Sequence, residues 1–184
     1  MAKYSSTPVD TKKSCMARGS YLRVHYKPCQ AVAKAIMGKS LLDAKKYLQD
    51  VIAHKSAVAF TQHNGGIGRH AQGKNLKSGS QCAWPEKACR FFLVLLDNLQ
   101  ANGEAKELDA AKLYISHSQA NHAPCGHRRT YRAHGRIGRI HPAHIEIIAS
   151  EKAETVARSK TPVLRRFTKK QIASKRLHLG GGLN

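Results

Sequence analysis

Between Gly126 and His144 the chain carries five arginines, four histidines and no acidic residue, in the run GHRRTYRAHGRIGRIHPAH. A guanidinium group binds two oxygens of one phosphate at once, while imidazole and tyrosine rings stack on unpaired bases. The run therefore favours contact with a polyanion that also presents bases, which is RNA. The residues alone leave a second interpretation open, a solvated basic loop without a preferred partner.

The whole chain shares this bias toward positive charge. Its 184 residues include 32 Lys and Arg against 11 Asp and Glu, which gives a formal net charge of +21. Such a charge opposes compaction unless an anion neutralises it, and nucleic acid supplies densely fixed phosphates. Residues 51–85 and 110–145 contain no acid, so their neutralisation must come from elsewhere. An anionic membrane and an acidic protein are weaker alternatives.

Other kinds of site are poorly supported by the residue patterns. The GxGxxA pattern at residues 66–71 lacks the helix that a dinucleotide-binding turn opens, because residues 72–80 are polar and contain two glycines. The few acids lie beside bases on expected helices, which does not predict a paired-carboxylate active site. A structural zinc site needs two compact ligand pairs, whereas this chain offers one loose cluster, His117, His122, Cys125 and His127. We therefore expect no enzyme, no cofactor and no metal.

Cysteine usage and apolar runs bear on the compartment. Five cysteines without a CxxC pair favour reduced thiols in the cytosol or nucleus. The longest purely apolar run, residues 91–96, is far shorter than the roughly 20 residues of a membrane-spanning helix. Residues 1–6 do not resemble a signal peptide. The expected location is cytoplasmic, with no membrane partner.

Three helices are expected to position the basic run. Residues 29–37 predict a helix that Gly38 ends, and Ser40 predicts the N-cap of a second helix with an apolar stripe to residue 52. The sequence Trp84-Pro85-Glu86 predicts the start of a third helix, because proline suits the first turn and an acid suits the positive helix end.

Apolar and polar residues alternate over residues 22–27, which predicts a short strand.

Two further extended runs, residues 112–119 and 144–149, predict paired antiparallel strands. Continued through the acid-free run, they form one long hairpin over about residues 112–149, with arms of roughly 40 Å. Only its base has apolar side chains to bury. The expected fold is α+β, with three helices on an antiparallel sheet and a long protruding β-hairpin. Residues 1–150 form this domain and residues 151–184 a basic C-terminal tail.

Four stretches also identify a family by resemblance. They are KSCMARGSYLRVHYK (13–27), HNGGIGRHAQ (63–72), WPEKACRFFLVLLDNLQAN (84–102) and HRRTYRAHGRI (127–137). In this order they closely resemble the ribosomal large-subunit protein family numbered twenty-two in the universal scheme and seventeen in the eukaryotic one. The resemblance covers about residues 3–150, and NGGIGR fits the eukaryotic or archaeal branch. Residues 125–127, the short return strand at 138–143 and the mixed Arg and Gly tail depart from the family pattern.

The resemblance implies a structural constituent of the large ribosomal subunit in translation. Its hairpin would bind rRNA and line the peptide exit tunnel, with the nascent peptide near its tip and other ribosomal proteins beside the domain. Assembly would be nuclear or nucleolar in a eukaryote. A non-ribosomal basic RNA chaperone or regulator is the alternative. The implied rRNA-contacting residues are Arg128, Arg129, Tyr131, Arg132, His134, Arg136 and Arg139 in the hairpin and, more loosely, Arg18, Arg23, His25, Lys27 and Arg69.

Overall fold

The structure is a computed structural model that describes residues 4–76, 80–129, 137–152 and 167–175. The chain divides into two units, Met1–Lys152 and Ala153–Asn184. The described part of the second unit contains one short helix, α4 (Lys169–Lys175), which the sequence patterns did not predict. Among the described residues no helix has both the length and the apolar character needed to cross a membrane.

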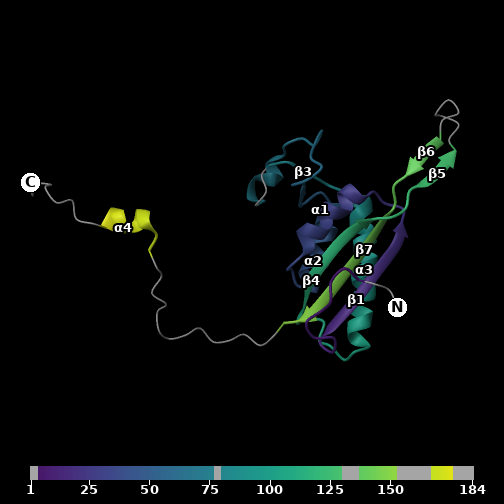
Figure 1. Cartoon of the computed structure of the whole chain (residues 1–184), viewed down its shortest axis with the longest axis horizontal. Coiled ribbons are helices and arrows are strands. Elements are labelled where there is room, and N and C mark those ends of the chain that lie inside the picture. The colour runs from purple at the N-terminus through teal and green to yellow at the C-terminus, as the bar shows by residue number, and fades with distance from the viewer. Residues whose placement is uncertain (1–3, 77–79, 130–136, 153–166, 176–184) are drawn as a thin grey trace, which may run out of the picture. The chain divides into compact units, whose positions relative to one another are not determined.

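A three-stranded antiparallel sheet forms the centre of the first unit (Figure 1). Strand β7 (Ala143–Glu151) lies between β1 (Ser14–Leu22) and β4 (Leu113–His122). Successive side chains of a strand point to opposite faces of the sheet. Ile145 and Ile147 therefore enter the main core on one face, while Glu146 lies on the other. The predicted pairing of the two extended runs is confirmed by the register of β4 with β7.

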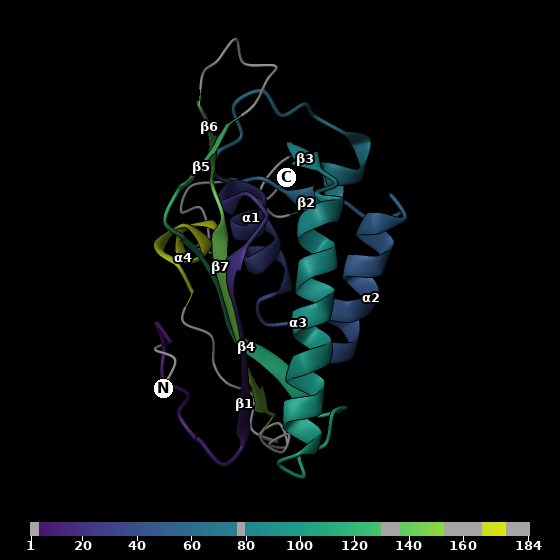
Figure 2. The ribbon, with the colours of Figure 1, turned by 90° about the vertical axis from the view of Figure 1, so that its right-hand side faces the viewer.

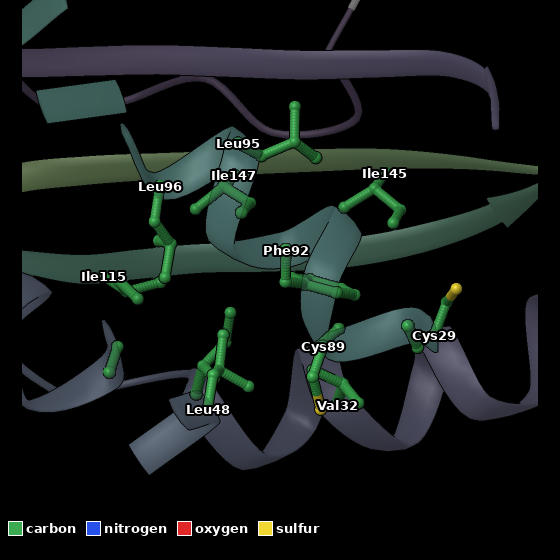
Figure 3. Packing of buried hydrophobic residues seen from close by; sticks show 14 of the residues in the cluster. Cys29, Val32, Leu48, Cys89, Phe92, Leu95, Leu96, Ile115, Ile145 and Ile147 are labelled. Carbon is green, nitrogen blue, oxygen red and sulfur yellow. The ribbon is translucent and has the colours of Figure 1, made fainter. Parts of the chain in front are cut away.

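Three helices cover one face of this sheet, and the N-terminal segment lies on the other (Figure 2). The helices are α1 (Tyr26–Ile36), α2 (Leu41–Ile52) and α3 (Glu86–Glu104). Figure 3 shows Phe92 of α3 among buried side chains from α1, α2 and the sheet. The predicted α+β class, with helices packed on an antiparallel sheet, is confirmed.

The predicted signals match the end of α1 and the start of α2, but α1 begins at Tyr26, three residues before the predicted start at residue 29. The Ser40 hydroxyl accepts a hydrogen bond from the Asp43 N–H at 3.1 Å, which satisfies one of the unpaired donors at the start of α2. Gly38, just beyond α1, has a φ of 81°, a conformation that glycine adopts without strain. Pro85 directly precedes α3. A side-chain cap therefore defines the start of α2, as the sequence indicated.

The strand predicted at residues 22–27 is wrong. Strand β1 ends at Leu22, and α1 already begins at Tyr26. The alternation had a different cause: Val24 is buried within the turn between the two elements, with 5% of its surface exposed. The actual strand was missed because its core-facing residues are small, such as Cys15 and Ala17.

Three short elements complete the first unit. Strand β2 (Val58–Ala59) pairs with β3 (Cys82–Ala83), and a 3-10 turn, η1 (Ala71–Asn75), lies in the polar loop between them. Beyond the end of the sheet, β5 (Gly126–Arg129) pairs with β6 (Ile137–Ile140). Residues 130–136, the tip of the expected hairpin, lie outside the described residues.

The ladder from β4 and β7 into β5 and β6 is interrupted. Pro124 and Pro142 lie at the break, and proline has no N–H to donate to a ladder. Across the junction the Ala123 N–H donates a backbone hydrogen bond to the Pro142 carbonyl at 3.1 Å. The two ladders are therefore separate pieces joined at this point.

Candidate nucleic-acid interface

The arginine-rich run is described only in part. Tyr131, Arg132, His134 and Arg136 lie outside the described residues, while the backbone of Arg128, Arg129 and Arg139 belongs to β5 and β6. In this described ladder each arginine lies opposite a residue of another kind, since the pairs are Arg128 with Gly138, Arg129 with Ile137 and Arg139 with His127. Like charges directly opposite one another destabilise a ladder, so this register suits a cationic ribbon.

Arg23, His25 and Lys27 lie together where β1 gives way to α1. All three are exposed, and the His25 ring centroid is 6.0 Å from that of His141, beside the start of β7. Among the described residues no carboxylate forms an ion pair with Arg23 or Lys27. This corner of the domain therefore presents uncompensated positive charge.

Arg69 lies in the polar loop between β2 and β3. It is exposed, and its backbone bridges that of Gln81. The Gln81 side chain accepts from the Asn64 amide at 2.7 Å and donates to the Ile67 carbonyl at 3.4 Å, which fixes the loop around its glycines. Over the described residues 66–76 the chain forms the 3-10 turn η1, and no α-helix begins there.

Arg18 is in a different setting from the other predicted contacts. It is half-buried on β1 and lies opposite Glu146 of β7 in the register. Glu146 is only 3% exposed and accepts hydrogen bonds from the Ser5 N–H at 3.2 and 3.3 Å. Burial raises the pKa of Tyr4, while the charge of Arg18 lowers it and that of Glu146 raises it. The Arg18 charge is thus close to a buried carboxylate.

The ion pairs gather mainly on the helical side of the domain. Lys45 of α2 lies 2.7 Å from Asp97 of α3, and Glu86 at the start of α3 pairs with both His54 and Arg90. These helices carry their own counter-charges. The exposed cations Arg23 and Lys27 lie elsewhere, at the end of the sheet where β1 ends and β7 begins.

At this end of the sheet the structure assembles rings that the sequence patterns did not bring together. Tyr26 stacks on His122 with 3.7 Å between centroids, and Tyr21 meets His144 edge-on at 4.7 Å. We call the set the imidazole–tyrosine cluster; its members are Tyr21, His25, Tyr26, His63, His122, His141 and His144. They come from four separate segments, so only the folded structure reveals their proximity.

Among the described side chains, the residues weighed above as zinc ligands form no group of three or more that could hold a metal ion. His117 lies against Glu146, with 3.5 Å between Nε2 and Oε1, while Sγ of Cys125 lies 3.2 Å from Nδ1 of His141.

Trp84 is held by contacts within the protein. Its side chain packs on the core, its ring lies near the rings of His54 and His70, and its Nε1–H donates a hydrogen bond to the Gln72 side chain. At the end of the sheet the described surface thus presents exposed cations, such as Arg23 and Lys27, and aromatic rings.

Comparison with known proteins places this chain among ribosomal proteins. The family described as Ribosomal protein L22p/L17e matches residues 17–150. A large ribosomal subunit protein uL22 of Theileria parva is 46% identical over all of both chains. The uL22A protein of Saccharomyces cerevisiae is 47% identical, over 93% of this chain and 94% of its own length, and the uL22 protein of Zea mays is 49% identical, over 85% and 92%. The chain belongs to the L22p/L17e family of ribosomal proteins, as its sequence motifs predicted.

Proposed function

We propose that this chain is a structural constituent of the large ribosomal subunit and that it acts by binding rRNA, without enzymatic activity. The observation that carries the proposal is the division of charge. The helical side contains its own ion pairs, whereas Arg23 and Lys27 at the sheet end have no carboxylate partner among the described residues. Phosphates supply the missing counter-charge. The relatives are named large ribosomal subunit proteins, which supports the same assignment.

The arginines on β5 and β6 extend this basic surface away from the domain. We infer that the full hairpin, about residues 112–149, inserts between rRNA segments and lines the peptide exit tunnel, with its tip near the nascent peptide. The chain would then work in cytoplasmic ribosomes after nuclear or nucleolar assembly, with other ribosomal proteins as neighbours. Replacing Arg132 and Arg136 by Ala is expected to impair subunit assembly but to leave the melting temperature of the free protein nearly unchanged, because the apolar core holds the domain.

Two matched substitutions test the phosphate contacts. Arg23→Gln and Arg90→Gln remove the same charge, but Arg90 is paired with Glu86 on α3 at 3.7 Å. The logarithm of the rRNA association constant is measured against the logarithm of the salt concentration, for the full chain. Arg23→Gln should reduce the slope by about 0.7–0.9 for each phosphate that its guanidinium neutralised, and Arg90→Gln should not. Equal effects would show that only total charge matters.

A non-ribosomal RNA chaperone is the competing assignment. Such a protein would bind many RNAs loosely, so it would leave the large subunit as salt rises. Sedimentation of cell extracts separates the two: one copy per large subunit that resists moderate salt supports the ribosomal assignment. Substoichiometric protein spread through the gradient would contradict it.

A further inference from the structure

Tyr21 is an exposed aromatic residue held in a strained backbone conformation. It has a φ of 54°, in the left-handed region that residues other than Gly, Asn and Asp rarely adopt. It lies where the register of β1 with β7 shifts between Gly19 and Leu22, so the chain bulges at this point. Strain of this kind persists where the surroundings enforce it, and it concentrates at functional sites.

The ring contributes little to the core of the domain. Tyr21 is 63% exposed and is absent from the buried cluster and from the residues packed against it. An Asn or Gly would fit the backbone at this position with less strain. Folding alone therefore does not account for a tyrosine here.

His144 fixes the position of Tyr21 from the neighbouring strand. Its Nδ1 accepts a hydrogen bond from the Tyr21 N–H at 3.0 Å, which leaves the ring proton of a neutral imidazole on Nε2. The two rings meet edge to face, with 4.7 Å between centroids and 87° between planes. The tyrosine ring is thus oriented by both its backbone and its side-chain neighbour.

The charges around this pair suit an anionic ligand. Residues 11–42 and 110–145, which supply the two rings, contain no acid, and exposed Arg23 follows two residues after Tyr21. The nearest acid along β7 is Glu146, which is buried and hydrogen-bonded to the Ser5 N–H. An exposed aromatic ring in an acid-free, arginine-containing segment is a surface on which unpaired bases stack.

We propose that Tyr21, oriented by His144, is a stacking site for an unpaired base of RNA. The inference rests on the rRNA binding proposed above and deepens it, because it assigns recognition of a base, not of a phosphate, to this chain's own bulge. Stacking buries the exposed ring face, while Arg23 is placed to meet the adjoining phosphate. The strain at Tyr21 is offset by the strands that hold it.

Three variants of the full chain separate ring stacking from charge and from folding. Tyr21→Asn removes the ring but keeps a residue that tolerates a positive φ, Tyr21→Phe keeps the ring, and Arg23→Gln removes a charge. The probe is in vitro transcribed large-subunit rRNA of Saccharomyces cerevisiae. Tyr21→Asn should weaken binding roughly 5- to 100-fold with an unchanged salt slope, Tyr21→Phe should bind like the parent, and Arg23→Gln should lower the slope. Ultraviolet irradiation of the parent complex should cross-link rRNA to the peptide that contains Tyr21.

The results distinguish failure of the stacking site from failure of the proposed rRNA binding. Parent-like binding by Tyr21→Asn, or a similar loss in Tyr21→Phe, overturns the stacking site while leaving the proposed function intact. Failure of the parent chain itself to bind the rRNA removes the proposed function, and the stacking site with it. Urea denaturation checks the fold: Tyr21→Asn should be at least as stable as the parent because the strained residue is replaced by one that tolerates the conformation.

Discussion

Glu146 is a buried carboxylate in a chain with a net charge of +21, and its replacement by Gln is the most informative test of the sheet's second face. The substitution keeps the approximate shape of the side chain, removes its charge and replaces one acceptor oxygen by an amide group that donates. In the parent the carboxylate accepts from the Ser5 N–H at 3.2 and 3.3 Å, and His117 Nε2 lies 3.5 Å away. Arg18 lies directly across the strand pair.

The expected loss follows from these contacts. A hydrogen bond to a charged group contributes about 1.5–3 kcal/mol, but removal of the charge also removes the cost of keeping it buried. Arg18, left without the nearby carboxylate, is half-buried and so remains partly solvated. We expect Glu146→Gln to lower the free energy of unfolding by about 2 kcal/mol. For a domain of this size that corresponds to a melting temperature lower by about 4–8 °C.

The assay is urea denaturation of the full chain at neutral pH, followed by the fluorescence of Trp84. Glu151→Gln is the matched control, because Glu151 lies on the same strand, is only half-buried and has no ion-pair partner among the described residues. It should change stability by no more than about 0.5 kcal/mol. If Glu146→Gln is as stable as the parent, or if both variants lose the same amount, the N-terminal segment is not anchored by this carboxylate.

Three further predictions concern burial and capping. Burial raises the pKa of the Cys29 and Cys89 thiols to about 12, so the folded chain keeps protons that the unfolded chain loses above the ordinary thiol pKa of 9.0. The urea midpoint of unfolding should therefore fall as the pH rises from 9.0 toward 12. A Cys29→Ala variant should show a shallower decline. Cys125 is the only exposed cysteine of the five, so mass spectrometry after brief alkylation of the folded chain should find a single label there, and labels elsewhere would contradict the packing. Ser40→Ala removes the cap of α2 and should cost about 1 kcal/mol by urea denaturation, whereas Ser40→Asp should retain most of the stability.

Local signals in the sequence were sufficient wherever one element decided the outcome. The spacing of Phe92, Leu95 and Leu99 defined α3 because all three turn toward the same core. Ser40 defined the start of α2 by its own hydrogen bond. In both cases the deciding interaction lies within a few residues along the chain, so periodicity and capping rules apply directly.

Sequence patterns failed where pairing between distant segments decided the structure. The strand β1 has little apolar alternation, and its place is set by pairing with β7, about 130 residues later in the chain. The same holds for the candidate site. The exposed cations Arg23 and Lys27 were found from their motif, but the contact between Tyr21 and His144 requires the register, which one sequence does not contain.

The division between helices and sheet end predicts that so cationic a chain can fold without RNA. Self-repulsion falls with distance and with salt, and the apolar cluster around Phe92 closes without any of the predicted RNA contacts. Arg128, Arg129 and Arg139 belong to β5 and β6, which pair with each other apart from the three-stranded sheet that carries the core. Salt should therefore act in opposite directions on the two processes, since it screens repulsion in the free protein and competes with phosphates in the complex. If folding itself required RNA, rising salt would instead remove structure and RNA binding together.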